Sequence, residues 1–192
     1  MAHSNNNEWE LSLWLMPQDG IWKVNAFHLD ASGVADRGVG TLWTLAKEER
    51  RAGHAFNAGI LYGTVRELLK RGPWLQLGVA RAFDEDARTL PPLAELQGPP
   101  PFHWRLGGAT YEVAGISPIA TEGMIGLSFG LPQIEWPATE GVIASNHAFL
   151  SAFMAAYPEV PKVFGYLVAR AVKPDRSGGY ATVYEYGRGF ND

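Results

Sequence analysis

The chain has 192 residues, of which 46% are hydrophobic and 19% charged, a composition that fits a globular protein and excludes an intrinsically disordered one. It contains no cysteine, which excludes disulfides, thiolate metal sites and a cysteine nucleophile. The formal net charge of −4 disfavours binding to nucleic acid, and no apolar run reaches the ~20 residues of a membrane-spanning helix. We therefore expect one soluble, cytoplasmic domain over residues 1–192.

The N-terminal region has the pattern of a β-hairpin over residues 8–30. In residues 9–15 apolar and polar side chains alternate, which is the period of a half-buried strand, and residues 17–20 supply a turn. Trp14 and Met16 fall on the opposite, otherwise polar face of the first strand. We expect another part of the chain, or a partner, to cover these two side chains.

A long helix is predicted over residues 47–71, ending at Gly72 and Pro73. Ala55, Gly59 and Gly63 recur every four residues, although glycine inside a helix costs about 1 kcal/mol relative to alanine. We therefore expect a strand or helix to approach closely along this row. Because apolar residues also lie on the other side of the helix, we expect it to be central in the fold.

Residues 74–83 are predicted to form a strand, and Asp84, Glu85 and Asp86 then open a proline-rich acidic loop over residues 84–101. A loop of this length is uncommon inside a compact domain and often carries function.

The remaining elements predict a mainly antiparallel sheet of short, hairpin-connected strands. The predicted strands are residues 102–106, 110–114, 124–131, 163–172 and 180–187, with a second helix over residues 146–157. Strands that are adjacent in sequence and joined by hairpins indicate an α+β fold in which the two helices, at about 47–71 and 146–157, pack on one face of the sheet.

The sequence contains no catalytic motif in the structural context that the motif requires. Residues 126–130 match the Gly-x-Ser-x-Gly pattern of a nucleophile elbow, but an elbow leads into a helix, and Pro132 and Pro137 prevent one here. We therefore expect Ser128 to lie in a strand without a catalytic role. The five histidines form no local metal motif and no phosphate-binding loop is present, so neither a metal nor a cofactor is predicted.

His54 and His147 are the weak catalytic candidates. His54 lies on the apolar side of the first helix, one turn after Arg50, and His147 lies in the first turn of the second helix. A histidine beside an arginine, or a neutral histidine at a helix start, could act as a base. A structural role is the commoner one for both positions.

An excess of aromatic residues favours a protein that binds a partner. Trp, Tyr and Arg dominate protein-binding hot spots. The predicted partner-binding residues are Asp84, Glu85, Asp86, Phe102, Trp104, Arg105 and Trp14. The acidic residues would attract a basic protein partner. The hypothesis is a non-catalytic protein that acts by covering its partner, as an immunity protein, an adaptor or a chaperone does, without binding nucleic acid or a membrane.

Two alternatives remain open. The first is a cofactor-independent enzyme or small-ligand-binding protein whose pocket lies between the sheet and the central helix, with His54, His147 and Tyr62 among its lining residues. The second is a subunit of a homo-oligomer in which Trp14 and Met16 are buried between copies.

Overall fold

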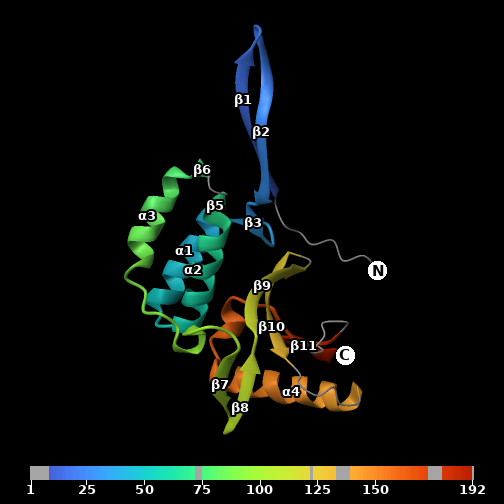
Figure 1. Cartoon of the computed structure of the whole chain (residues 1–192). Helices are drawn as coiled ribbons and strands as arrows, with labels where there is room; N and C mark the ends of the chain where they lie inside the picture. Colours follow the sequence, from blue (N-terminus) through green and yellow to red (C-terminus); the bar gives the residue numbers. More distant parts are fainter. Residues whose placement is uncertain (1–8, 72–74, 122, 133–138, 173–178, 192) are drawn as a thin grey trace.

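The computed structural model describes residues 9–71, 75–121, 123–132, 139–172 and 179–191. The helices in these ranges are α1 (Val39–Arg51), α2 (Ala55–Leu69), α3 (Gly78–Ala87) and α4 (Thr139–Ala156), with short 3-10 helices η1 (Ala94–Leu96) and η2 (Val160–Lys162). The strands are β1 (Trp9–Gln18), β2 (Ile21–Ala31), β3 (Gly33–Val34), β4 (Arg37–Gly38), β5 (Lys70–Arg71), β6 (Leu75–Gln76), β7 (Phe102–Leu106), β8 (Ala109–Val113), β9 (Gly115–Thr121), β10 (Met124–Pro132), β11 (Tyr166–Val172), β12 (Gly179–Glu185) and β13 (Gly189–Asn191). The fold is therefore α+β, as predicted (Figure 1).

The largest sheet has five strands in the order β13-β12-β11-β10-β9. All neighbouring strands in it are antiparallel except β10 and β11, which run parallel with Gly126 opposite Tyr166. A parallel pair requires a crossover connection, and α4 lies in the chain between these two strands. The prediction of hairpin connections is therefore wrong for this one βαβ unit.

The helix predicted over residues 47–71 is two helices, α1 and α2. Gly53 separates them with a φ of 78°, a left-handed conformation that glycine adopts without steric cost. The first helix begins at Val39, eight residues before the predicted start. The central position predicted for the helix holds for α2, since ten of its fifteen residues are buried.

The other helix boundaries also differ from the sequence prediction. The predicted strand over residues 74–83 is mostly helix α3, because Phe83 and Ala87, four residues apart, both turn into the core. Helix α4 begins at Thr139, seven residues before the predicted start at residue 146. Glu140 in the first turn is favourable beside the positive end of the helix dipole.

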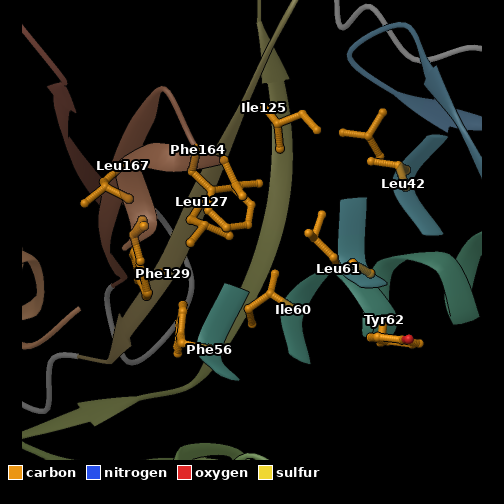
Figure 2. Close-up of a cluster of buried hydrophobic side chains, with 14 of the residues drawn as sticks. Leu42, Phe56, Ile60, Leu61, Tyr62, Ile125, Leu127, Phe129, Phe164 and Leu167 are labelled. Atoms are coloured by element: carbon orange, nitrogen blue, oxygen red, sulfur yellow. The ribbon is translucent and has the colours of Figure 1, made fainter. Parts of the chain in front are cut away.

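The core lies between one face of the large sheet and helices α2 and α4. Figure 2 shows the part of the core in which side chains of α2 face those of β10. Phe129 of β10 packs against Phe153 of α4 with 4.7 Å between ring centroids, and Phe153 packs against Phe56 of α2 at 5.3 Å. Leu127 and Leu61 are also fully buried. The two helices therefore share one apolar layer with the sheet.

The row of small residues in α2 is only partly explained by close packing. A Cβ atom at Gly59 would overlap the side chain of Leu93, which precedes η1, so an extended segment approaches the helix there. A Cβ atom at Gly63 would meet nothing within 4 Å. A close approach therefore exists at Gly59, but the approaching residue belongs to a loop and not to the predicted strand or helix, and at Gly63 the prediction is wrong.

Candidate partner-binding surface

Strands β1 and β2 form a two-stranded ribbon that projects from the rest of the chain (Figure 1). The register pairs Gln18 with Ile21 across Asp19 and Gly20, whose φ angles are 55° and 76°. Two positive φ angles in a two-residue loop define a type I′ turn, whose twist matches that of the flanking strands. The hairpin predicted over residues 8–30 is therefore confirmed.

A bulge in β2 gathers the apolar side chains of the ribbon on one face. Leu13 lies opposite Phe27 and Leu15 lies opposite Val24, so Asn25 has no partner in the register. An extra residue reverses the alternation of the strand beyond it. The face that results, called the apolar face below, consists of Trp9, Leu11, Leu13, Leu15, Trp22, Val24, Phe27 and Leu29.

All eight side chains of the apolar face are more than half exposed, with exposed fractions between 51% and 71%. The hairpin supplies ten of the thirteen exposed large hydrophobic side chains among the described residues. The half-buried strand that the alternation predicts is therefore wrong for this face. Alternation reveals that a strand has an apolar face, but it does not say that the same chain covers that face.

Trp14, a predicted partner-binding residue, lies on the opposite face of the ribbon. It sits across from Ala26 and is partly buried. Met16 lies on the same side, across from Lys23, and is 53% exposed. The opposite face therefore mixes apolar and charged side chains, whereas the apolar face carries no charge.

The ribbon also has no neighbouring strand on either side within the described residues. Its extensive contacts are between its own two strands. An isolated two-stranded hairpin is marginally stable in water, and its unpaired edges and apolar face are liabilities unless something covers them. These features make the apolar face the candidate partner-binding surface.

The structure places the predicted acidic loop residues on helix α3. Residues 84–87 are helical, so the loop predicted over residues 84–101 begins later than expected. Asp84 and Glu85 are exposed, and Glu85 accepts a 3.2 Å bond from Nε of Arg81 one turn earlier. Arg81 offsets part of the acidic charge on this side of α3.

Asp86 holds three helices together. Its Oδ2 accepts hydrogen bonds from Tyr62 Oη at 2.6 Å and from Trp43 Nε1 at 2.7 Å, and its Oδ1 pairs with Arg50 Nη2 at 2.7 Å. Arg50 also donates to Thr89 Oγ1 at 2.9 Å. The side chain of Asp86 is therefore occupied within the protein by partners from α1 and α2.

The protonation of this cluster follows from its contacts. Burial alone would raise the pKa of Asp86, but the hydrogen bonds from Tyr62, Trp43 and Arg50, together with the charge of Arg50, hold that pKa below its ordinary value. Burial and the hydrogen bond donated to Asp86 raise the pKa of Tyr62 to about 12. The ionised carboxylate of Asp86 thus accepts a hydrogen bond from the neutral phenol of Tyr62, and this bond links α3 to α2.

The three candidates in β7 have different environments. Trp104 is 2% exposed, and its Nε1 donates to the backbone oxygen of Glu95 at 2.7 Å. Its ring stacks on Phe153 of α4. Phe102 is partly buried and packs against the core, whereas Arg105 is exposed. Trp104 is therefore a core residue that a partner cannot reach in the folded chain.

His54 belongs to a polar link between the α1–α2 turn and η2. Its Nδ1 lies 2.8 Å from Glu49 Oε2, and Lys162 Nζ lies 2.9 Å from its Nε2. Glu49 also accepts from Asn57 Nδ2, which donates to the backbone oxygen of Glu159 as well. With the imidazole proton on Nδ1, Nε2 accepts from the lysine ammonium. The cluster ties two segments 108 positions apart in sequence.

His147 and Ser128 have packing environments. The ring of His147 stacks on Phe190 of β13 with 4.0 Å between centroids. Ser128 lies in the middle of β10, between Ser117 of β9 and Val168 of β11, and is 7% exposed. The strand continues on both sides of Ser128, so the turn that a nucleophile elbow requires is not formed. His54, Tyr62 and His147 thus contact three different partners, which are Glu49, Asp86 and Phe190.

A groove of about 440 Å³ does lie between α2 and β9. Its lining is mainly apolar and includes Gly63, Thr64, Glu67, Leu96 and Ile116. The open space beside Gly63 is part of this groove, and it would accommodate a small apolar ligand. Across the described ranges, no three His, Asp or Glu side chains gather as metal ligands would. None of the described helices is both long and apolar enough to cross a membrane.

Comparisons of this chain with models of protein families, with curated proteins and with solved structures find no match.

Proposed function

We propose that this chain is a partner-binding protein and that the β1–β2 hairpin is its docking element. The observation that carries the proposal is the apolar face: eight large side chains on a projecting ribbon, each more than half exposed to solvent. Adaptors, chaperones and immunity proteins share this mode of action, in which one protein covers a surface of another.

The amount of apolar surface supports the proposal. The largest apolar patch on a typical monomer measures about 300–600 Å² and often marks a binding site. Trp9, Trp22 and Phe27 are 62%, 68% and 71% exposed, so at about 150–250 Å² for a whole aromatic side chain they alone expose roughly 400 Å². Four leucines and one valine of the apolar face, each more than half exposed, add to this area. A face of that size lowers the free energy of a complex that removes it from water.

The arrangement of the ribbon also suits docking. The type I′ turn and the bulge set the register of the two strands, so one chain by itself places all eight apolar side chains on one face. A partner that packs on this face would also stabilise the hairpin, which is marginally stable without further contacts. The exposed carboxylates of Asp84 and Glu85 on α3 remain candidates for attracting a basic partner, although Asp86 is occupied by Tyr62, Trp43 and Arg50.

The test compares two neighbouring residues on opposite faces of β1. Leu15 and Met16 are 51% and 53% exposed, and only Leu15 belongs to the apolar face. Affinity purification of the tagged full chain from its host should recover a stoichiometric complex with the wild type and with Met16→Glu, and lose it with Leu15→Glu. Equal recovery with both variants, or a chain that never leaves the monomer mass in the host extract, would refute the proposed function.

A further inference from the structure

We infer that the partner of the apolar face is the same face of a second copy of this chain, packed against it in a two-fold antiparallel arrangement. This inference rests on the proposed function and names the partner. In such a dimer the same residues of both copies form the contact, as they do in most homo-oligomers.

The area agrees with what a dimer needs. A stable interface buries about 800 Å² from each partner. The three aromatic side chains of the apolar face expose roughly 400 Å² by themselves, and the five Leu and Val side chains, each more than half exposed, add to it. Face-to-face packing of two sheets brings their planes to about 10 Å and lets their side chains interdigitate. Two copies would therefore bury most of the apolar face without help from the rest of the chain.

The chemistry favours a copy over a different protein. Interfaces between different, separately stable proteins are about as polar as the rest of the surface and carry about one hydrogen bond per 100–200 Å². The apolar face has no charged side chain and no side-chain hydrogen-bonding group except the indole N–H of Trp9 and Trp22. Such a face resembles the apolar interface of permanent homodimers, and two copies of it meet without repulsion between like charges.

The shape of the molecule favours the antiparallel arrangement. In Figure 1 the rest of the chain lies at the base of the hairpin and spreads to both sides of it. A parallel pair would place both bodies at the same end with their hairpins only about 10 Å apart. An antiparallel pair places the bodies at opposite ends. Trp9, near the base of one copy, then lies close to Trp22, near the tip of the other, and Leu13 lies near the two-fold axis.

The first experiment measures the mass of the purified full chain by sedimentation equilibrium. We expect twice the 21.0 kDa of one chain for the wild type and for Met16→Glu. We expect Leu15→Glu to raise the dissociation constant by roughly 100-fold, because each dimer would bury two unpaired carboxylates. Circular dichroism should show the same folded signal for both variants, since neither side chain packs on the core.

The second experiment tests the arrangement and uses the absence of cysteine in the chain. Trp9→Cys and Trp22→Cys each introduce a single thiol. A short bis-maleimide should link the two variants when they are mixed and allowed to exchange, and should link neither variant to itself. Efficient linkage of Trp9→Cys to itself would show a parallel pair and overturn the antiparallel arrangement.

A monomer mass for the wild type at every concentration would overturn the second-copy inference. A different result would refute the proposed function: Leu15→Glu would weaken none of the complexes that the chain forms, whatever their composition. A monomer whose host complex is lost in Leu15→Glu would identify a different protein as the occupant, and a monomer that floats with lipid vesicles in a Leu15-dependent way would identify a membrane. Both outcomes refute a second copy.

Discussion

Val24 and Phe27 lie on the same face of β2, although an odd number of positions separates them along the strand. In a regular strand, residues three apart point to opposite faces. The bulge at Asn25 removes this conflict, because the register steps from Phe27 opposite Leu13 to Val24 opposite Leu15. One extra residue thus joins the apolar residues of the tip with those of the base.

Deleting Asn25 should therefore leave the apolar face intact. Without Asn25, Val24 and Phe27 lie two positions apart in a regular strand, so both still point to the same face and keep Leu15 and Leu13 as their partners. We expect the dissociation constant of the complex formed by the hairpin to change by less than about tenfold, the equivalent of roughly 1.4 kcal/mol. Sedimentation equilibrium of the deletion variant measures this change.

Asn25→Ala is the control for that deletion, because it keeps the extra residue and should bind as the wild type does. Cross-strand nuclear Overhauser effects between the backbones of Leu15 and Val24 report whether the register at the tip persists. A rise of about tenfold or more for the deletion variant, with Asn25→Ala unchanged, would mean that a shared face is not sufficient for docking.

The hairpin was predictable because its signals are local. Alternation over residues 9–15 and the Asp19-Gly20 dipeptide are contained in the sequence, and the strands end within one residue of the predicted limits of 8–30. A signal for the bulge is also present in the sequence, because the apolar residues of β2 that lie on the apolar face have even numbers at Trp22 and Val24 and odd numbers at Phe27 and Leu29.

Local signals in the sequence predict neither the exposure of the apolar face nor the presence of helix α3. Whether an apolar face is covered depends on segments distant in sequence, and periodicity carries no information about them. Helix α3 is fixed by Asp86, whose partners Trp43 and Tyr62 come from α1 and α2. The acidic run at residues 84–86 therefore predicts a solvated loop, although one of its residues, Asp86, makes tertiary contacts.

The two glycines of α2 should respond in opposite ways to alanine. Gly63→Ala should raise the free energy of unfolding by about 0.5–1 kcal/mol, because alanine favours the helix and nothing lies within 4 Å of the new Cβ. Gly59→Ala should lower it by about 1–3 kcal/mol, because the new Cβ overlaps Leu93. Urea denaturation of both variants measures these changes.

Leu93→Ala supplies the control for the glycine pair. If overlap with Leu93 is the cause, Gly59→Ala should be less destabilising in that background than in the wild type. Equal effects of alanine at Gly59 and Gly63 would show that Leu93 does not restrict the helix.

Trp104 and Arg105 are adjacent in β7, and the structure assigns them different environments. Trp104→Ala should lower the free energy of unfolding by about 3–5 kcal/mol, because it empties a core position that packs against Phe153. Arg105→Ala should change it by less than about 0.5 kcal/mol, as exposed substitutions do. Thermal or urea denaturation distinguishes them, and a mild effect of Trp104→Ala would contradict the buried position of its ring.

Asp86→Asn should destabilise the fold in a way that depends on pH. At pH 7 we expect a loss of about 2–4 kcal/mol, because an asparagine cannot accept from Tyr62, Trp43 and Arg50 together and carries no charge for Arg50. The pKa of Asp86 in the folded chain is lowered from an ordinary value of 3.8. Its ionised form therefore stabilises the fold fully above that ordinary value, and the contribution disappears as the pH falls through the lower folded pKa. The difference in the free energy of unfolding between wild type and Asp86→Asn, measured by urea denaturation from pH 7 to pH 2, should shrink in acid.

Asp84→Asn, on the exposed side of the same helix, should stay within about 0.5 kcal/mol of the wild type throughout this pH range. A constant difference for Asp86→Asn across this range would show that the charge of Asp86 does not hold α1, α2 and α3 together.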